Sequence, residues 1–231
     1  MKALNARDDS TRRSWVQALR DHQLLYPDER VVSFLARRFP SVVNNGEHHA
    51  IDIGCGSGRH VKLMLDYGFQ TWGIDYAAES VDMVRSAFHG HPLLREVVLG
   101  DFRETAFPTS FHAVVAWGVL FLNPPSEMVS NLRGMGRLLG PDGRLLVNFR
   151  TRENFHFGLG EEIEPGCFIL DDRAGTYKGM CYTFTDLPDV EALVERAGGM
   201  DIVHVEKTTF VKNNLSELHS WLQIELKPSE R

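Results

Sequence analysis

Short apolar runs alternate with amphipathic segments between residues 48 and 150, and this rhythm predicts strands that alternate with helices. Ala50-Ile51-Asp52-Ile53 is short enough for a buried strand, whereas Val81, Val84 and Phe88 recur at the spacing of one helix face. Strands in such an order form a parallel sheet with helices on both faces. The predicted strands lie at 50–53, 71–75, 97–99, 113–117 and 144–149, and the predicted helices at 61–67, 78–88 and 128–139.

The two ends of the chain depart from this rhythm. Trp15 and Leu19 lie at helical spacing, and Pro27 opens a second apolar-periodic segment, so residues 1–45 are predicted to form a helical cover that ends in an Asn-Asn-Gly turn. Residues 151–182 hold many glycine, charged and aromatic residues without clear periodicity. A stretch of that length is unusual as a plain connection, and we expect it to be a substrate lid inserted in the domain.

A helix predicted at 186–197, capped near Thr185 or Asp186, precedes two β-rich runs at 202–211 and 218–226. The two runs are joined by Lys212-Asn213-Asn214, which predicts a hairpin at one edge of the sheet. The fold class that follows is α/β. We expect a single domain over 1–231, with a doubly wound seven-stranded mostly parallel sheet, an antiparallel C-terminal hairpin strand and helices on both faces.

Composition narrows the class of protein. The chain has 231 residues, 43% hydrophobic and 24% charged, which is typical of a globular protein, and no apolar run is long enough to span a membrane. The N-terminus lacks the apolar stretch of a secretory signal. A net charge of -6 argues against a nucleic-acid partner. Cys55, Cys167 and Cys181 are too few and too scattered for a disulfide framework or a zinc site, which favours the cytoplasm. A homodimer is compatible with these features.

The most informative segment is the loop with Gly54, Gly56 and Gly58, which follows the first predicted strand and opens a helix. Glycines there let the backbone turn sharply and approach a ligand closely. The spacing G-x-G-x-G brings the third glycine one residue early for a dinucleotide fingerprint, and the residues of a P-loop are missing. Asp75 ends the second strand, where a carboxylate can accept from both ribose hydroxyls, and Asp101 follows the third strand, where it can accept from an exocyclic amine.

Taken together, these motifs resemble the class I S-adenosylmethionine-dependent methyltransferases. The resemblance covers residues 48–150 well and the C-terminal hairpin more loosely. One departure is His112, where the family commonly has aspartate. The segments that carry the resemblance are Ile51-Asp52-Ile53-Gly54-Cys55-Gly56-Ser57-Gly58, Gly73-Ile74-Asp75, Gly100-Asp101-Phe102, 111–115 and 138–146.

The resemblance implies S-adenosylmethionine as the cofactor and S-adenosylhomocysteine as its product. It implies that the glycine loop holds the methionine end, that Asp75 binds the ribose, and that Asp101 and Phe102 contact the adenine. The metal-binding carboxylates of catechol-type relatives are absent, so no metal is expected. The expected cofactor-binding residues are Asp52, Gly54, Cys55, Gly56, Gly58, Asp75, Tyr76, Asp101, Phe102, Trp117 and Gly118.

Methyl transfer to a protonated nucleophile needs alignment, exclusion of water and a base. His156 in the predicted lid and His219 at the start of the last strand are the candidate bases. Side chains at the carboxyl ends of strands and in the two covering segments are the candidates for contact with a small-molecule acceptor, and an arginine can hold an acidic acceptor through two bonds. These candidates are Tyr26, Asn148, Arg150 and Tyr182.

The sequence thus predicts a methyltransferase that acts on an O or N nucleophile of a sugar, a polysaccharide precursor or a secondary metabolite. Two alternatives stay open. Asn123-Pro124-Pro125 resembles the motif of enzymes that methylate adenine or glutamine amides, although here it lies late after the fourth strand and also has the pattern of a helix start. A non-catalytic module that only binds the cofactor would carry the same loop and aspartates.

Overall fold

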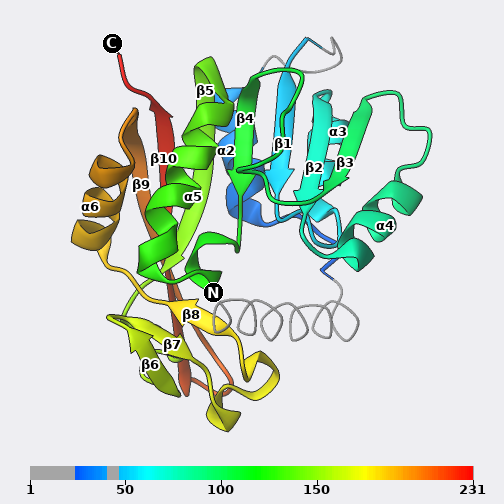
Figure 1. Cartoon of the computed structure of the whole chain (residues 1–231). Coiled ribbons are helices and arrows are strands. Elements are labelled where there is room, and N and C mark those ends of the chain that lie inside the picture. The colour runs from blue at the N-terminus through cyan, green and yellow to red at the C-terminus, as the bar shows by residue number, and fades with distance from the viewer. Residues whose placement is uncertain (1–23, 41–46, 231) are drawn as a thin grey trace.

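The computed structural model describes residues 24–40 and 47–230, which form a seven-stranded sheet between two layers of helices (Figure 1). The strand order is β3-β2-β1-β4-β5-β10-β9. Strands β1 to β5 are parallel, and β10 is antiparallel to both of its neighbours, so it alone runs against the others. The predicted fold class is confirmed. The strand order reverses between β1 and β4, and in such sheets ligands bind at the carboxyl edge beside that reversal.

Most predicted elements agree with the structure to within a few residues. The strands of the large sheet are β1 (His49–Ile53), β2 (Gln70–Asp75), β3 (Leu94–Leu99), β4 (Phe111–Ala116), β5 (Leu139–Arg150), β9 (Met200–Lys212) and β10 (Glu217–Pro228). The helices are α2 (Glu29–Arg38), α3 (Arg59–Tyr67), α4 (Ala78–Ala87), α5 (Pro125–Leu138) and α6 (Leu187–Ala197), with 3-10 turns η1 (Leu120–Leu122) and η2 (Asp172–Tyr177).

Helices α5 and α6 cover one face of the sheet. The apolar residues Met128, Leu132 and Met135 recur every three or four positions along α5, so they share one face and are buried against β4 and β5. Val190 and Leu193 of α6 join the same core. This core is the largest in the molecule and fixes the carboxyl ends of β4 and β5, where the acceptor side of the site is built.

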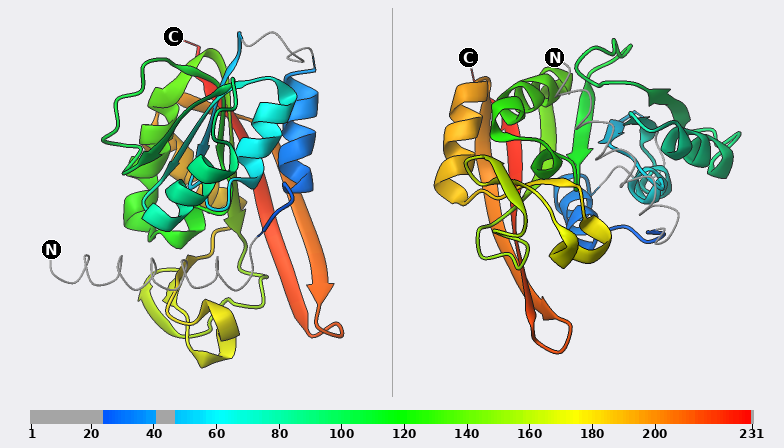
Figure 2. Two further views of the ribbon diagram at one scale, coloured as in Figure 1. Left: turned by 90° about the vertical axis from the view of Figure 1, so that its right-hand side faces the viewer. Right: turned by 60° about the horizontal axis from the view of Figure 1, so that its bottom comes forward.

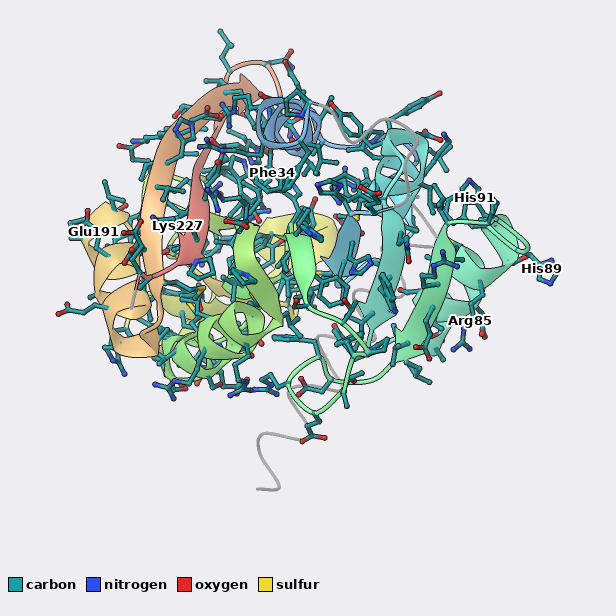
Figure 3. The ribbon with its side chains drawn as sticks, turned by 90° about the horizontal axis from the view of Figure 1, so that it is seen from above. Phe34, Arg85, His89, His91, Glu191 and Lys227 are labelled. Atoms are coloured by element: carbon teal, nitrogen blue, oxygen red, sulfur yellow. The ribbon has the colours of Figure 1, made fainter. Side chains whose placement is uncertain are left out.

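Helices α2 and α3 cover the opposite face. Phe34 of α2, Met64 of α3 and Phe69 are fully buried in one cluster with β4 and β5, and Figure 3 shows Phe34 on the α2 side of the sheet. Helix α4 packs beside α3, with Val81 and Val84 against β2 and β3. The predicted helix around residues 15–19 and the turn at 44–46 lie outside the described residues.

Two boundaries differ from the prediction. Helix α5 begins three residues before the predicted start, with Pro124 at the N-cap position and Pro125 in the first turn. Proline is tolerated there because the N–H groups of the first turn have no partner within the helix. The predicted turn at Asp142-Gly143 lies inside β5, where the pairing with β4 shifts register between Phe111 and Ala113. The step from Leu139 to Arg144 along β5 is longer than the opposite step from Phe111 to Ala113 along β4, so the predicted turn is an irregularity within β5.

The insertion is structured, although its sequence shows no period. It contains a three-stranded antiparallel sheet of β6 (Glu161–Glu164), β7 (Cys167–Ile169) and β8 (Cys181–Thr183). Strands of three or four residues are too short to show alternation, which is why periodicity missed them. Phe168, Met180 and Phe184 form a separate apolar core with Phe121 of the loop after β4. Figure 1 shows this small sheet below the carboxyl ends of β4 and β5.

Strands β9 and β10 form the predicted hairpin, and Figure 2 shows it extending past the helices toward the end where the small sheet lies. Positive φ values at Asn213 and Asn214 form its turn, a conformation that asparagine tolerates better than most residues. No helix in the described part of the chain has the length and apolarity needed to cross a bilayer.

Candidate cofactor and acceptor site

The glycine loop after β1 is fixed by glycine at positions where a side chain does not fit. Gly54 has φ +70°, and a Cβ added there would lie 2.6 Å from Val119 Cγ2. Gly58 has φ +81°, and its Cβ would lie 2.9 Å from Val84 Cγ2. Both positions combine the left-handed conformation with close packing, so the loop brings its bare backbone to the carboxyl edge of the sheet.

Asp75 ties this loop to the end of β2. Its Oδ2 accepts from the Gly56 N–H at 2.9 Å, and its Oδ1 accepts from the Ala77 N–H at 2.9 Å. The carboxylate is only 3% exposed. Burial raises its pKa, and the backbone N–H groups oppose that rise. Sequence reasoning proposed a ribose contact and missed this second task, which is to hold the glycine loop in shape.

Asp52 of β1 is a buried acid with unused bonding capacity. It is 1% exposed, and its Oδ2 has no partner among the described residues. Burial raises the pKa of Asp52 to about 8, with Asp75 adding to the rise and Arg59 opposing it. His60 Nδ1 lies 3.9 Å from Asp52 Oδ1, and burial lowers the pKa of His60 to about 3, so this histidine supplies no positive charge at neutral pH. A buried acceptor of this kind suits a positively charged ligand group.

Asp101 lies at the surface after β3. Its side chain is 31% exposed and accepts two bonds from Arg103 Nε, at 2.9 and 3.0 Å. Phe102 packs toward α5, since a Cβ built on Gly134 would lie 3.0 Å from its ring. The ring is therefore held by the core rather than turned fully toward a ligand.

Two predicted site residues have their side chains committed elsewhere. Cys55 Sγ points into the core with Val61 and Val81, so only the backbone of Cys55 can contact a cofactor. Asn148 was expected to contact the acceptor, but its Oδ1 accepts from the Gly118 N–H at 2.7 Å and the residue is 1% exposed. Asn148 instead joins the ends of β4 and β5.

The segment before α2 lies beside the glycine loop. Ser57 Oγ donates to the Leu24 carbonyl, and the Asp28 N–H donates to His60 Nε2 at 3.3 Å. Tyr26, another predicted acceptor contact, belongs to this segment, and its ring is 82% exposed. A ring so exposed is not part of the buried acceptor cluster described next, so its contact with an acceptor stays a prediction. Tyr76, expected at the cofactor, is 45% exposed at the end of β2.

Arg150, at the last position of β5, lies among three aromatic rings. Its guanidinium carbon is 4.0 Å from the ring centre of Trp221, 4.5 Å from that of Tyr182 and 4.8 Å from that of Phe121. Trp221 pairs directly with Arg150 across β5 and β10, and sequence reasoning missed it because that pairing is not visible before the sheet order is known.

The two predicted bases meet beside Arg150. The ring centres of His156 and His219 are 5.7 Å apart, and His156 lies 5.7 Å from Tyr182. His156 Nδ1 bonds Asn154 Oδ1 at 3.1 Å. Because an amide oxygen only accepts, Nδ1 carries the proton and Nε2 is the basic atom of the ring. Burial, with Arg150 nearby, lowers the pKa of His156 to about 4, so the ring is neutral at pH 7.

His219 is held differently. It stacks on Phe210 with ring centres 5.2 Å apart, and its Nε2 lies 3.4 Å from Glu217 Oε2. Burial lowers its pKa, and Glu217 opposes that change. The structure therefore brings together His156, His219, Arg150 and Tyr182, which come from four segments of the chain. We call this group, with Phe121, Asn154 and Trp221, the acceptor cluster.

Residues 50–143 match the family model described as a methyltransferase domain, the region that holds the glycine loop, Asp75 and Asp101. The matched region is therefore a methyltransferase domain, and the class I S-adenosylmethionine-dependent methyltransferases are the family that its motifs resemble. The cypemycin N-terminal methyltransferase of a Streptomyces species is 30% identical to it over 113 residues, which is 48% of this chain and 45% of that protein. The chain spans between 6% and 54% of the curated relatives that it matches.

Solved structures share the fold of this chain. The 1,6-didemethyltoxoflavin-N1-methyltransferase of Burkholderia thailandensis, with bound 1,6-didemethyltoxoflavin and S-adenosylhomocysteine, is similar at a TM-score of 0.70 and 17% identity, covering 96% of this chain and 89% of that one. The magnesium protoporphyrin IX methyltransferase of Synechocystis, with bound S-adenosylmethionine, is similar at a TM-score of 0.60 and 14% identity, covering 87% of this chain and 79% of that one.

The residues present fit S-adenosylmethionine, which is bound in a solved structure of the same fold. The unused buried Oδ2 of Asp52 matches a ligand ammonium group. The space beside Gly118, at the end of β4, is open: a Cβ there would meet nothing within 4 Å. Among the described residues no group of three or more His, Cys, Asp or Glu side chains is arranged to hold a metal.

Proposed function

We propose that this methyltransferase transfers the methyl group of S-adenosylmethionine to an O or N nucleophile of a small molecule, such as a sugar, a polysaccharide precursor or a secondary metabolite. The observation that carries this proposal is the acceptor cluster, where a neutral buried histidine lies beside a buried arginine. The similar fold of a methyltransferase with a bound small-molecule acceptor supports it. The net charge of -6 favours a small molecule over a nucleic acid. The cysteine pattern favours a cytoplasmic location.

On the cofactor side, we assign Asp52 to the methionine amine, and the backbone of the glycine loop to the methionine end. We assign Asp75, which also holds the Gly56 and Ala77 N–H groups, to the ribose hydroxyls. Asp101 meets the adenine amine beside its bond to Arg103. Tyr76, Phe102 and Trp117-Gly118 complete this side, with Gly118 at the methyl-donor position.

The bound cofactor supplies a methyl group on a positively charged sulfur, which an acceptor atom attacks in line. His156 Nε2 takes the proton that the acceptor O–H or N–H loses, and returns it to solvent after the transfer. The pKa of about 4 keeps Nε2 unprotonated at neutral pH, although it also makes the histidine a modest base. The insertion 151–182 acts as a lid that excludes water from the acceptor cluster.

The alternative reaction on an adenine or glutamine amide finds less support. The Asn123 amide donates to the Val119 carbonyl at 2.9 Å and to the Leu120 carbonyl, so it stabilises the turn after β4. Pro124 and Pro125 begin α5. These residues have local structural tasks that account for the motif.

Transfer of isotope tests the proposal. The protein is incubated with S-adenosylmethionine carrying a labelled methyl group and a panel of small hydroxy and amino compounds. Label is expected in the small-molecule fraction, and at limiting S-adenosylmethionine its amount is expected to be lower with the Asp75→Ala variant. Binding of S-adenosylhomocysteine without any transfer would instead identify a cofactor-binding module, and label on adenine in DNA or on a protein glutamine would support the amide alternative.

A further inference from the structure

We propose that the acceptor carries an anionic group, a carboxylate or a phosphate, that pairs with Arg150. The inference rests on the proposed function for the identity of the ligand as the methyl acceptor. The negative charge of that ligand is inferred from the structure, because Arg150 is a buried cation whose bonding capacity is largely unused.

The bonds of Arg150 are few and long. Its Nη1 lies 3.5 Å from Asn154 Oδ1, and its Nη2 lies 3.4 Å from the Tyr182 hydroxyl, both near the outer limit for a hydrogen bond. Its Nε is buried and has no partner among the described residues. A guanidinium has five N–H donors, so most of them have no good acceptor here.

The surroundings of Arg150 offer no counter-charge. Across residues 24–40 and 47–230 no carboxylate forms an ion pair with it, and its walls are the rings of Phe121, Tyr182 and Trp221. Asn154, whose Oδ1 lies near Arg150 Nη1, also has a buried Nδ2 without a described partner. Arg150 Nε and Asn154 Nδ2 are thus buried donors without a described acceptor, and an oxyanion would satisfy both.

One buried charged group elsewhere in the described residues is fully paired. Glu225 of β10 is 1% exposed, and its oxygens accept from Arg37 Nη2 at 2.6 Å and from Arg38 Nε at 2.7 Å. A buried charge without such partners is destabilising. Cation–π contacts with the three rings offset part of that cost. An arginine at this position is therefore explained by a ligand that completes its pairing.

The position of Arg150 makes the anion useful for the reaction. Arg150 ends β5 two residues after Asn148, which bonds Gly118 at the proposed methyl-donor position. His156 also lies near Arg150, and the positive charge of Arg150 helps to lower the pKa of His156. An anion held there anchors the acceptor between the methyl donor and the base. Because Arg150 is only 5% exposed, the pair is shielded from water, and the ligand enters when the insertion or nearby side chains shift.

Binding of matched probes tests this without requiring turnover. Titration calorimetry with saturating S-adenosylhomocysteine compares benzoate, phenyl phosphate and neutral benzamide. The wild type is expected to bind at least one of the two anions tenfold or more tightly than benzamide, and the tighter of the two identifies the anion. Arg150→Met is expected to lose this preference and keep its affinity for S-adenosylhomocysteine. Arg152→Met is the matched control, because Arg152 is exposed and paired with Asp186 at 2.8 Å, and it is expected to bind the anions as the wild type does.

Asn154→Asp provides a second variant that tests the proposal independently of the first. It places a carboxylate next to Arg150, so the pair forms inside the protein, and the melting temperature is expected to rise while the anion affinity falls at least tenfold. Equal binding of benzamide and both anions by the wild type overturns the proposal, as does unchanged anion affinity in Arg150→Met or in Asn154→Asp. Arg150-dependent anion binding without isotope transfer would refute the proposed function and leave this anion site standing.

Discussion

The glycine loop and the acceptor cluster lie at the same edge of the sheet, yet their buried polar groups are satisfied in opposite ways. In the loop, Asp75 is bonded to backbone N–H groups of residues close by, and glycines with positive φ set the shape. In the cluster, Arg150 and Asn154 keep buried donors without a described partner. The backbone of the loop is held before any ligand arrives, with the Oδ2 of Asp52 as the unpartnered acceptor beside it, whereas the second region keeps unpartnered donors. A cofactor that many enzymes share needs a loop whose shape is already fixed. An acceptor that is specific to this chain permits a site that its ligand completes.

The largest expected effect comes from a substitution in the acceptor cluster that lowers kcat without changing the affinity for the cofactor product. His156→Gln removes the basic Nε2 and is expected to lower kcat about 10²–10⁴-fold, the usual contribution of a general base. Affinity for S-adenosylhomocysteine should stay the same. The His219→Gln variant serves as the comparison, and an equal loss of kcat in both variants would contradict a separate role for His156.

The same histidine predicts the acid limb of the pH profile. Its pKa of about 4 lies below the ordinary value, so the base stays unprotonated as pH falls through the neutral range. The kcat/KM is expected to stay flat from pH 8 to about 5 and to fall below that, as protonation removes the base. A wild-type profile that already fell tenfold between pH 7 and pH 6 would show that another group is the base.

The next effect belongs to the loop. Gly54→Ala forces a Cβ into contact with Val119 and holds a side chain at φ +70°. Strain of about 1–2 kcal/mol from the left-handed conformation, together with about 1–3 kcal/mol from overpacking, is expected to weaken S-adenosylhomocysteine about a hundredfold in calorimetry. Gly90→Ala is the control, because Gly90 has a similar φ of +76° but open space around it and lies outside the glycine loop. The Kd of this variant for S-adenosylhomocysteine should match that of the wild type.

Asp75→Ala should weaken S-adenosylhomocysteine at least tenfold, or about 1.4 kcal/mol, because it removes the ribose acceptor and frees the Gly56 N–H. Asp66→Ala provides a control, since Asp66 is an exposed partner of Lys62 on α3. An unchanged affinity in Asp75→Ala would mean that neither the ribose contact nor the tie to the loop matters for binding.

The contrast between the two regions also explains what the sequence could predict. The glycine loop and Asp75 lie within 25 residues of one another and are joined by one strand, one helix and one turn, so local rules were enough to place them. The cluster draws on η1, β5, β8 and β10, and Trp221 reaches Arg150 only through the pairing of β10 with β5. His156, His219, Arg150 and Tyr182 could be proposed as residue types with the right chemistry. Their mutual packing, and the use of Asn148 and Cys55 in the interior, depended on tertiary contacts that no local pattern encodes.

The smallest expected effect concerns Asp101, the exposed member of the cofactor side. Its carboxylate already accepts four bonds from Arg103, one from the backbone N–H and three from the guanidinium, and its side chain is 31% exposed, so water screens any contact with an adenine amine. An exposed hydrogen bond is worth about 0.5–1.5 kcal/mol, so Asp101→Ala is expected to weaken S-adenosylhomocysteine about threefold in calorimetry. Arg103→Met should leave the affinity within about twofold, because it frees the carboxylate instead of removing it. A loss of more than tenfold in Asp101→Ala would show that this surface carboxylate becomes buried when the cofactor binds, and that the cofactor side is also completed by its ligand.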